Sequence, residues 1–163
     1  MNILFICTHN RCRSILCEAV TRHLSGSRIN AFSAGSQPAG EVHPLSLKFL
    51  AKRGIDISNL RSQSWDDFAA TTIDIAITVC DSAAGESCPL WLGNSPKVHW
   101  GLSDPSKLTG TDDDIEVAFN TCIDAIEARI NALLGLDFET LDTPTLVAAL
   151  GEIHNNANQG STL

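Results

Sequence analysis

The stretch Ile3-Leu4-Phe5-Ile6-Cys7-Thr8-His9-Asn10-Arg11-Cys12-Arg13-Ser14 decides the fold of this chain. Residues 3–7 are apolar at every position, without alternation, as in strands that are buried on both faces of a parallel sheet. Apolar residues then recur at roughly helical spacing over residues 14–25, and Gly26 marks the expected end of that helix. The stretch therefore predicts a buried strand, a tight polar loop and a helix that begins where the loop ends.

The alternation of strand and helix continues along the chain. Strands are predicted at residues 29–34, 73–80 and 97–100, and helices at residues 44–53 and 112–134. Strands that alternate with helices form right-handed βαβ units. The sequence predicts one α/β domain: an open four-stranded parallel sheet with helices on both faces, of the flavodoxin-like type.

The pattern weakens in the last part of the chain. Residues 1–135 are predicted to form the catalytic domain, and residues 136–163 a C-terminal extension. Within the extension, residues 143–150 are expected to form one short helix, and the polar residues 155–163 a frayed tail.

Composition restricts the partners and the compartment. The chain has 163 residues, of which 44% are hydrophobic and 18% charged, as in an ordinary globular domain. A formal charge of -8 argues against nucleic acid or an anionic membrane surface as a partner. No apolar run approaches the roughly 20 residues of a membrane span, and the N-terminal residues do not resemble a signal peptide. We therefore expect a cytoplasmic protein.

Cysteine is unusually frequent for a protein of a reducing compartment. No Cys-x2-Cys pair occurs and the five His residues are scattered, so the sequence predicts no zinc site. Redox or nucleophilic chemistry is the better explanation for the six cysteines, which are Cys7, Cys12, Cys17, Cys80, Cys88 and Cys122.

The polar loop after the first strand has the residues of an oxyanion site. Backbone N–H groups converge between a strand end and a helix start, where the helix dipole also favours an anion. This field should lower the pKa of the Cys7 thiol and make it a nucleophile. Arg13 can donate two N–H groups to a tetrahedral anion, and Asn10 tolerates the left-handed turn that such a loop requires. The predicted oxyanion-binding residues are Thr8, His9, Asn10, Arg11, Cys12, Arg13 and Ser14.

This loop resembles the signature Cys-x-Gly-Asn-x-Cys-Arg-Ser of the low-molecular-weight protein tyrosine phosphatase superfamily. The two agree at Cys7, Asn10, Cys12, Arg13 and Ser14, whereas His9 stands where the family usually has glycine. Further similar stretches follow in order: Ser33-Ala34-Gly35, Gly54-Ile55-Asp56-Ile57-Ser58 and Asp104-Pro105. The resemblance implies that Asp104 is a general acid, which protonates the oxygen that leaves when Cys7 attacks.

Within the superfamily the chain resembles the arsenate reductases. The likeness rests on Val79-Cys80, Cys88-Pro89 and His99-Trp100-Gly101, and the chain has none of the tyrosines by which the phosphatases usually stack an aryl substrate. Because Cys80 ends a predicted core strand, we expect it at the same sheet edge as Cys7, although a cysteine at a strand end can also be a plain core residue.

The resemblance to the reductases implies a thiol relay. Cys7 attacks arsenate, Cys80 then attacks Cys7 and releases arsenite, and Cys88 moves the disulfide outward to Cys80. The implied function is arsenic detoxification. The relay implies no cofactor beyond an external dithiol reductant, with thioredoxin or another small redox protein as partner and phosphate or sulfate as substrate analogues.

Some family members bind potassium beside the catalytic loop. The positions matched here are Asn10, Glu18 and Ser33, but Gln63 stands in place of an aspartate, so we predict no tight metal site. Cys12, Cys17 and Cys122 are predicted to be structural.

Two other functions stay open at this point. An aryl-phosphate (protein tyrosine) phosphatase would need only Cys7, Arg13 and Asp104. A non-enzymatic anion or redox sensor would need only Cys80 and Cys88 to be reactive.

Overall fold

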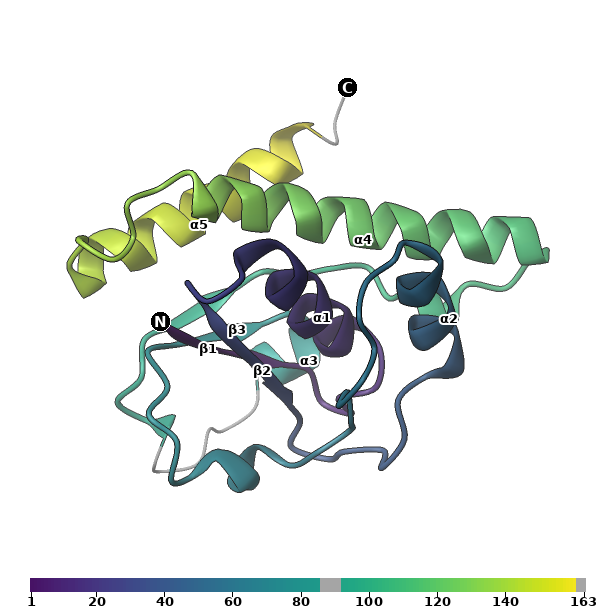
Figure 1. Cartoon of the computed structure of the whole chain (residues 1–163), viewed down its shortest axis with the longest axis horizontal. Helices are drawn as coiled ribbons and strands as arrows, with labels where there is room; N and C mark the ends of the chain where they lie inside the picture. The colour runs from purple at the N-terminus through teal and green to yellow at the C-terminus, as the bar shows by residue number, and fades with distance from the viewer. Residues whose placement is uncertain (86–91, 161–163) are drawn as a thin grey trace.

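In a computed structural model of the chain, which describes residues 1–85 and 92–160, four parallel strands form one sheet (Figure 1). The strands are β1 (Asn2–Ile6), β2 (Asn30–Ala34), β3 (Ile75–Thr78) and β4 (Lys97–His99), arranged in the order β2-β1-β3-β4. Every strand pair is parallel, so the carboxyl ends of all four strands lie at one edge. The order reverses between β1 and β3, and ligand sites of open α/β sheets form at such a point. The predicted fold class is confirmed.

The sequence of β1 explains its central place. Ile3, Leu4 and Phe5 are fully buried, and β1 is hydrogen-bonded to β2 on one side and β3 on the other. A strand with packed residues on both faces needs no polar alternation.

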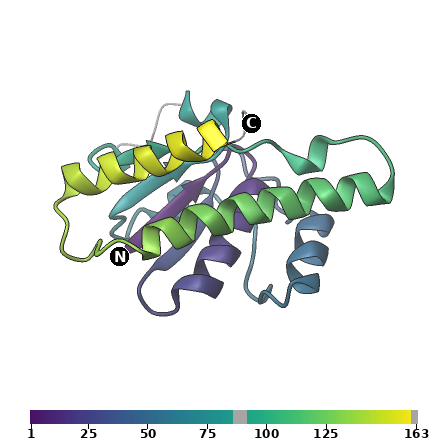
Figure 2. The same cartoon turned by 90° about the horizontal axis from the view of Figure 1, so that it is seen from above.

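The long helices lie on one side of the sheet. Helix α1 (Arg13–Ser25) lies between the sheet and α4 (Asp112–Leu134), and α4 also contacts α2 (Pro44–Lys52) and α5 (Thr143–Gly160) (Figure 1). Figure 2 shows α4 and α5 side by side over the sheet.

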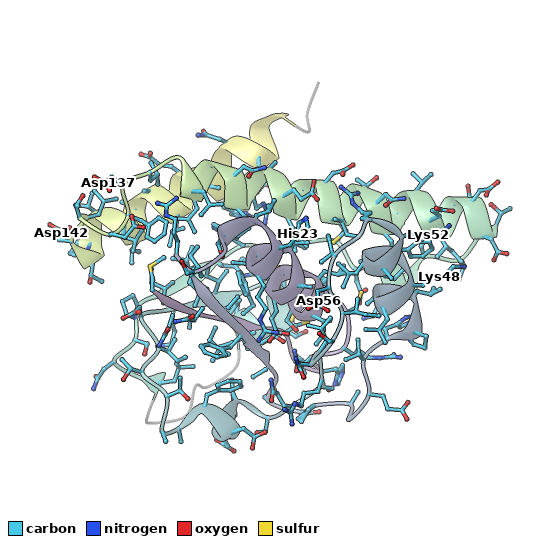
Figure 3. All side chains as sticks on the ribbon, viewed as in Figure 1. His23, Lys48, Lys52, Asp56, Asp137 and Asp142 are labelled. Carbon is cyan, nitrogen blue, oxygen red and sulfur yellow. The ribbon has the colours of Figure 1, made fainter. Side chains whose placement is uncertain are left out.

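Ion pairs connect the C-terminal end of α2 to α4. Lys52, labelled in Figure 3 beside α4, places its Nζ 3.0 Å from Glu116 Oε1. Arg53 places its Nη2 2.7 Å from Asp124 Oδ1 and 3.0 Å from Glu127 Oε2. These pairs are partly exposed, so they orient α2 more than they stabilise the fold.

Short elements complete the architecture. The 3₁₀ helix η1 (Trp65–Phe68) covers the opposite face of the sheet, where the Phe68 ring lies 5.3 Å from that of Phe32 on β2. Helix α3 (Asp81–Ala84) follows β3 directly, and the 3₁₀ helix η3 (Pro105–Lys107) precedes α4.

Helix α5 is longer than the sequence predicted. A short helix over residues 143–150 and a frayed tail from residue 155 were expected, but α5 continues to Gly160. The helix is anchored because Leu146 and Leu150 are buried and the indole N–H of Trp100 donates to the Leu150 carbonyl at 2.9 Å. Once a helix is nucleated on a core, it propagates through a polar segment at little cost.

No helix in the described part of the chain has the length and apolar character needed to cross a membrane.

The anchoring of α5 gives a stability prediction. Leu150→Ala removes a fully buried side chain and should lower the free energy of unfolding by about 2–5 kcal/mol, as measured by urea denaturation. Val117→Ala on the exposed side of α4, where 65% of the side chain is accessible, is the matched control and should change it by less than about 0.5 kcal/mol. If Leu150→Ala changed the free energy of unfolding as little as Val117→Ala does, α5 would not belong to the core.

Candidate active site

The loop between β1 and α1 turns at a single residue. Asn10 has φ of +46°, in the left-handed region that the sequence predicted for it. Among the described residues, Asn10 and Asn59 are the two non-glycine residues with positive φ, so His9 keeps an ordinary backbone conformation. The absence of the family's glycine at position 9 is therefore tolerated without strain.

The side chain of Asn10 fixes this turn from behind. It is fully buried and donates through Nδ2 to Ser14 Oγ at 2.8 Å and to Ser33 Oγ at 2.9 Å. Its Oδ1 accepts the Gln63 backbone N–H at 2.8 Å. Every hydrogen-bonding atom of the amide is used, so the loop has one conformation held by three other segments.

The carbonyl groups of the loop point away from the pocket. Thr8 O, His9 O and Arg11 O accept backbone N–H groups of Gln37, Ala39 and His43 at 2.9, 3.0 and 2.8 Å. In a trans peptide the N–H points opposite to the C=O, so the N–H groups of His9 and Cys12 in these peptide units turn inward, while the Asn10 N–H donates to the Cys7 carbonyl at 3.2 Å. This arrangement is the convergent set of donors that an oxyanion needs.

Gly35 is required by this close approach of two backbones. A Cβ at position 35 would lie 2.4 Å from Thr8 O and 2.6 Å from Cys7 O. The loop can thus be bound by the chain after β2 only if residue 35 has no side chain.

The described site residues line one cavity of about 230 Å³. The lining contains Cys7, the loop residues from Thr8 to Arg13, Cys80 and Asp104, which the sequence predicted. It also contains Ser82, Ser106 and Lys107, which the sequence analysis missed, because single polar residues in short loops carry no periodic signal.

Two predicted residues do not line this cavity. Ser14 is fully buried behind the loop, where its hydroxyl accepts from Asn10. Cys88 lies outside the described residues.

Arg13 and Asp104 form an ion pair at the mouth of the cavity. Arg13 Nη2 lies 3.4 Å from Asp104 Oδ2, and Arg13 Nη1 donates to Leu102 O at 3.0 Å. The other oxygen of Asp104 accepts from the Ser106 N–H and hydroxyl at 2.9 and 2.6 Å. One carboxylate oxygen is therefore held by the loop, while the other faces Arg13.

The thiols of Cys7 and Cys80 are hydrogen-bonded to each other inside the cavity. This bond lowers the pKa of Cys80 to about 5, with help from the N–H groups of Thr8 and Ala83, while burial opposes the shift. The same bond and burial raise the pKa of Cys7, against the attraction of Arg13. The sequence predicted the opposite direction at Cys7, since it could not show a second thiol in contact.

The two thiols therefore titrate as a unit. The first proton leaves the pair at low pH and the second is retained, so the pair carries one negative charge near neutrality. Cys80 Sγ also accepts the Ala83 N–H at 3.4 Å and lies 3.8 Å from Thr8 Oγ1. Cys80 is thus only 4% exposed and still lines the cavity.

The remaining described cysteines stay protonated. Burial raises the pKa of Cys12 to about 11, that of Cys122 to about 12, and that of Cys17 well above its usual range. Cys17 on α1 and Cys122 on α4 are buried where these two helices contact.

Hydrogen bonds within the protein occupy two of the oxygens near Asn10 that correspond to the potassium site of some family members. The Ser33 carbonyl, which can only accept, takes the side-chain amide N–H of Gln63 at 3.1 Å, and Asn10 Oδ1 is used by the Gln63 backbone. Burial raises the pKa of Glu18 to about 7, and one of its oxygens lies 3.3 Å from Arg22 Nη2. An N–H group thus lies where a cation would need another oxygen. In the described residues no three His, Cys, Asp or Glu side chains are grouped to hold a metal.

Comparison with known proteins identifies the class. The chain matches the low molecular weight phosphotyrosine protein phosphatase family over residues 2–145 and belongs to this family. It is similar to the arsenate reductases of Halalkalibacterium halodurans, at 37% identity, and of Bacillus subtilis, at 33%. Each alignment spans 128 residues, which are 78% of this chain and 91% of the relative.

Solved structures agree with these relatives. An arsenate reductase in the phosphate binding state superposes with a TM-score of 0.68 at 27% identity, over 82% of this chain and 96% of that one. The thioredoxin-dependent arsenate reductase of Corynebacterium glutamicum superposes with a TM-score of 0.63 at 31% identity, over 82% of this chain and 60% of that one.

The contact at Gly35 gives a test of the loop. Gly35→Ala should abolish phosphate binding measured by calorimetry and lower the melting temperature, because the added methyl group collides with two loop carbonyls. Gly151→Ala on α5, where a Cβ meets nothing within 4 Å, is the control and should stabilise the protein by about 0.5–1 kcal/mol. Undiminished phosphate binding in Gly35→Ala would contradict this geometry.

Proposed function

We propose that this protein reduces arsenate to arsenite by a relay of cysteine thiols. The observation that carries the proposal is the second thiol in the cavity: Cys80 lines it together with Cys7, and the two side chains are hydrogen-bonded. Hydrolysis of a phosphate ester has no use for this thiol, whereas a two-electron reduction needs it. The arsenate reductases among the relatives support the same conclusion.

The first step is attack of the Cys7 thiolate on arsenic(V). As the oxyanion enters among the loop N–H groups, it competes for Arg13, whose guanidinium can turn from Asp104 to two oxygens of the substrate. Asp104 donates a proton to the leaving oxygen, which departs as water, and a Cys7 sulfur–arsenic bond is formed. Transfer of the proton of Cys7 to the substrate supplies the nucleophile and leaves Cys80 as the thiolate that attacks in the next step.

The second step reduces arsenic. The Cys80 thiolate attacks Cys7 Sγ, a disulfide forms and the sulfur–arsenic bond breaks with its electron pair left on arsenic. Arsenic(V) becomes arsenic(III), arsenite leaves, and the two thiols supply the two electrons. The hydrogen bond between the two thiols supports this step, because it keeps the attacking sulfur next to Cys7.

The third step returns Cys7 to its thiol form. Cys88 attacks Cys80 Sγ, and the disulfide moves to Cys80–Cys88, where an external dithiol reduces it. We propose thioredoxin as this reductant on the strength of the Corynebacterium glutamicum enzyme, and no bound cofactor. We place the reaction in the cytoplasm, where free thiols persist.

Phosphatase activity is the second candidate function. It is favoured by the family match and by Cys7, Arg13 and Asp104 in one cavity. The shared cavity makes ester hydrolysis a possible side reaction, and it would use no other cysteine.

Asp104→Asn tests the general acid. The variant should bind phosphate like the parent but form the Cys7 adduct about 10²–10⁴-fold more slowly, since the amide cannot supply the proton. Rapid-quench kinetics with arsenate measures the rate and calorimetry the binding. A collapse of phosphate binding instead would assign Asp104 a purely structural role.

Single substitutions of the two relay thiols separate reductase from phosphatase. Cys88→Ser should complete one turnover and stop with a Cys7–Cys80 disulfide, whereas the parent without reductant should stop with Cys80–Cys88. Cys80→Ser should release no arsenite. Peptide mass mapping after one arsenate turnover identifies the disulfides.

Cys122→Ser is the matched control for these variants, since Cys122 is a buried thiol outside this cavity. Multiple-turnover reduction by both relay variants with thioredoxin would refute the relay. Ester hydrolysis, measured with p-nitrophenyl phosphate, should persist in both relay variants, because it needs neither Cys80 nor Cys88 as a thiol.

A further inference from the structure

A chain of hydrogen bonds crosses the sheet edge beside Cys80. Thr78 Oγ1 lies 2.8 Å from His99 Nδ1, and His99 Nε2 lies 3.0 Å from Asp81 Oδ1. Thr78 and Asp81 are the last residue of β3 and the first of α3, so the chain spans the two residues between them, of which Cys80 is one.

The partners define the tautomer of His99. An ionised Asp81 carboxylate can only accept, so His99 Nε2 carries a proton and donates it. In the neutral imidazole Nδ1 is then the acceptor, and the Thr78 hydroxyl donates to it. Both ring nitrogens of His99 are thus used in hydrogen bonds.

Two neighbours lie close to the His99 ring. A Cβ at Gly101 would lie 3.0 Å from His99 Nε2 and would press on the bond to Asp81. On another side, the His154 ring of α5 lies edge-on to His99 with 6.0 Å between centroids. The His99 side chain itself is 36% exposed, so it adds little to the buried core.

The bond to Asp81 acts on the first turn of α3. Cys80 caps this helix, and its sulfur accepts the N–H of Ala83 within the same turn. A four-residue helix cannot hold its shape alone, and Asp81 is otherwise almost fully exposed. His99 therefore links the turn that carries the Cys80 donor to β3 and β4.

We propose that His99 is a positioning residue for Cys80: through Thr78 and Asp81 it holds the first turn of α3 so that this turn stabilises the Cys80 thiolate beside Cys7. Its effect on catalysis rests on the proposed function, but its effect on the thiolate does not. Two other titratable groups face the pair of thiols, Arg13 and Asp104, and substitutions at His99 or Asp81 remove neither of these side chains.

The thiolate is measured by alkylation. Iodoacetamide reacts with thiolate, so the rate at Cys80, followed by peptide mass mapping from pH 4 to 9, reports its titration. In His99→Leu the first turn of α3 loses its link, and the rate at Cys80 near pH 4, below the pKa of about 5, should fall about tenfold, which corresponds to about one pKa unit upward. His154→Leu removes the neighbouring ring but keeps both hydrogen bonds, and its profile should match the parent.

A pair of variants at Asp81 isolates the bond itself. Asp81→Asn and Asp81→Leu both remove the charge, but asparagine keeps an oxygen that can accept from His99 Nε2. The leucine variant should therefore react several-fold more slowly at Cys80 than the asparagine variant near pH 4, below the pKa of Cys80. Because Asp81 is exposed, these variants should fold even if His99→Leu does not.

Arsenite release in a single turnover is then measured on the same proteins. His99→Leu should release arsenite more slowly than the parent, while inorganic phosphate should bind to both with equal affinity. Equal alkylation profiles of the two Asp81 variants, or of His99→Leu and the parent, would overturn the positioning role. If the alkylation profile of His99→Leu is shifted but the parent protein does not reduce arsenate, the positioning role of His99 is supported and the proposed function is refuted.

Discussion

The buried amide of Asn10 is the contact on which the site depends. It joins the catalytic loop to α1 through Ser14, to β2 through Ser33 and to the backbone of Gln63. A buried amide with all its hydrogen bonds made is costly to disturb, since any movement leaves a polar atom unpaired away from water. The inward N–H groups, the left-handed turn and the direction of Arg13 all follow from this fixed loop.

The parallel sheet adds a second constraint, because the carboxyl ends of its strands lie at one edge. Cys7 follows β1, Cys80 follows β3, and the segment with Asp104 follows β4, so each catalytic group extends from a buried strand. The end of β4 is further held because Arg129 donates to the carbonyls of Trp100 and Gly101 at 3.1 and 3.3 Å. The rigid strands therefore place the nucleophile, the second thiol and the general acid at one cavity.

The sequence predicted those parts of the structure that local patterns encode. Apolar runs marked the strands, and Cys7 with Arg13 marked the loop, because backbone physics at a strand–helix junction is local. It could not predict the direction of the Cys7 pKa, which depends on a thiol 73 residues further along. It also underestimated α5, whose polar end has no helical pattern of its own and is ordered by the docking of Leu146 and Leu150. The sequence also could not show that Ser14 lies behind the loop, because its hydrogen bond with Asn10 depends on the turn at Asn10.

The register between β1 and β3 has a consequence for the oxidation chemistry. Ile6 pairs with Thr78, and the Val79 N–H donates to the Ile6 carbonyl, so Cys80 lies one residue beyond the neighbour of Cys7. Parallel strands about 4.8 Å apart, with a rise of about 3.3 Å per residue, put the two Cα atoms roughly 6 Å apart. Disulfides span about 4.4–6.8 Å between Cα atoms. The strand register therefore sets the distance over which the two sulfur atoms must bond. A slip of one residue that moved Cys80 further from Cys7 would put the two Cα atoms roughly 8 Å apart, beyond the reach of a disulfide, without changing either cysteine.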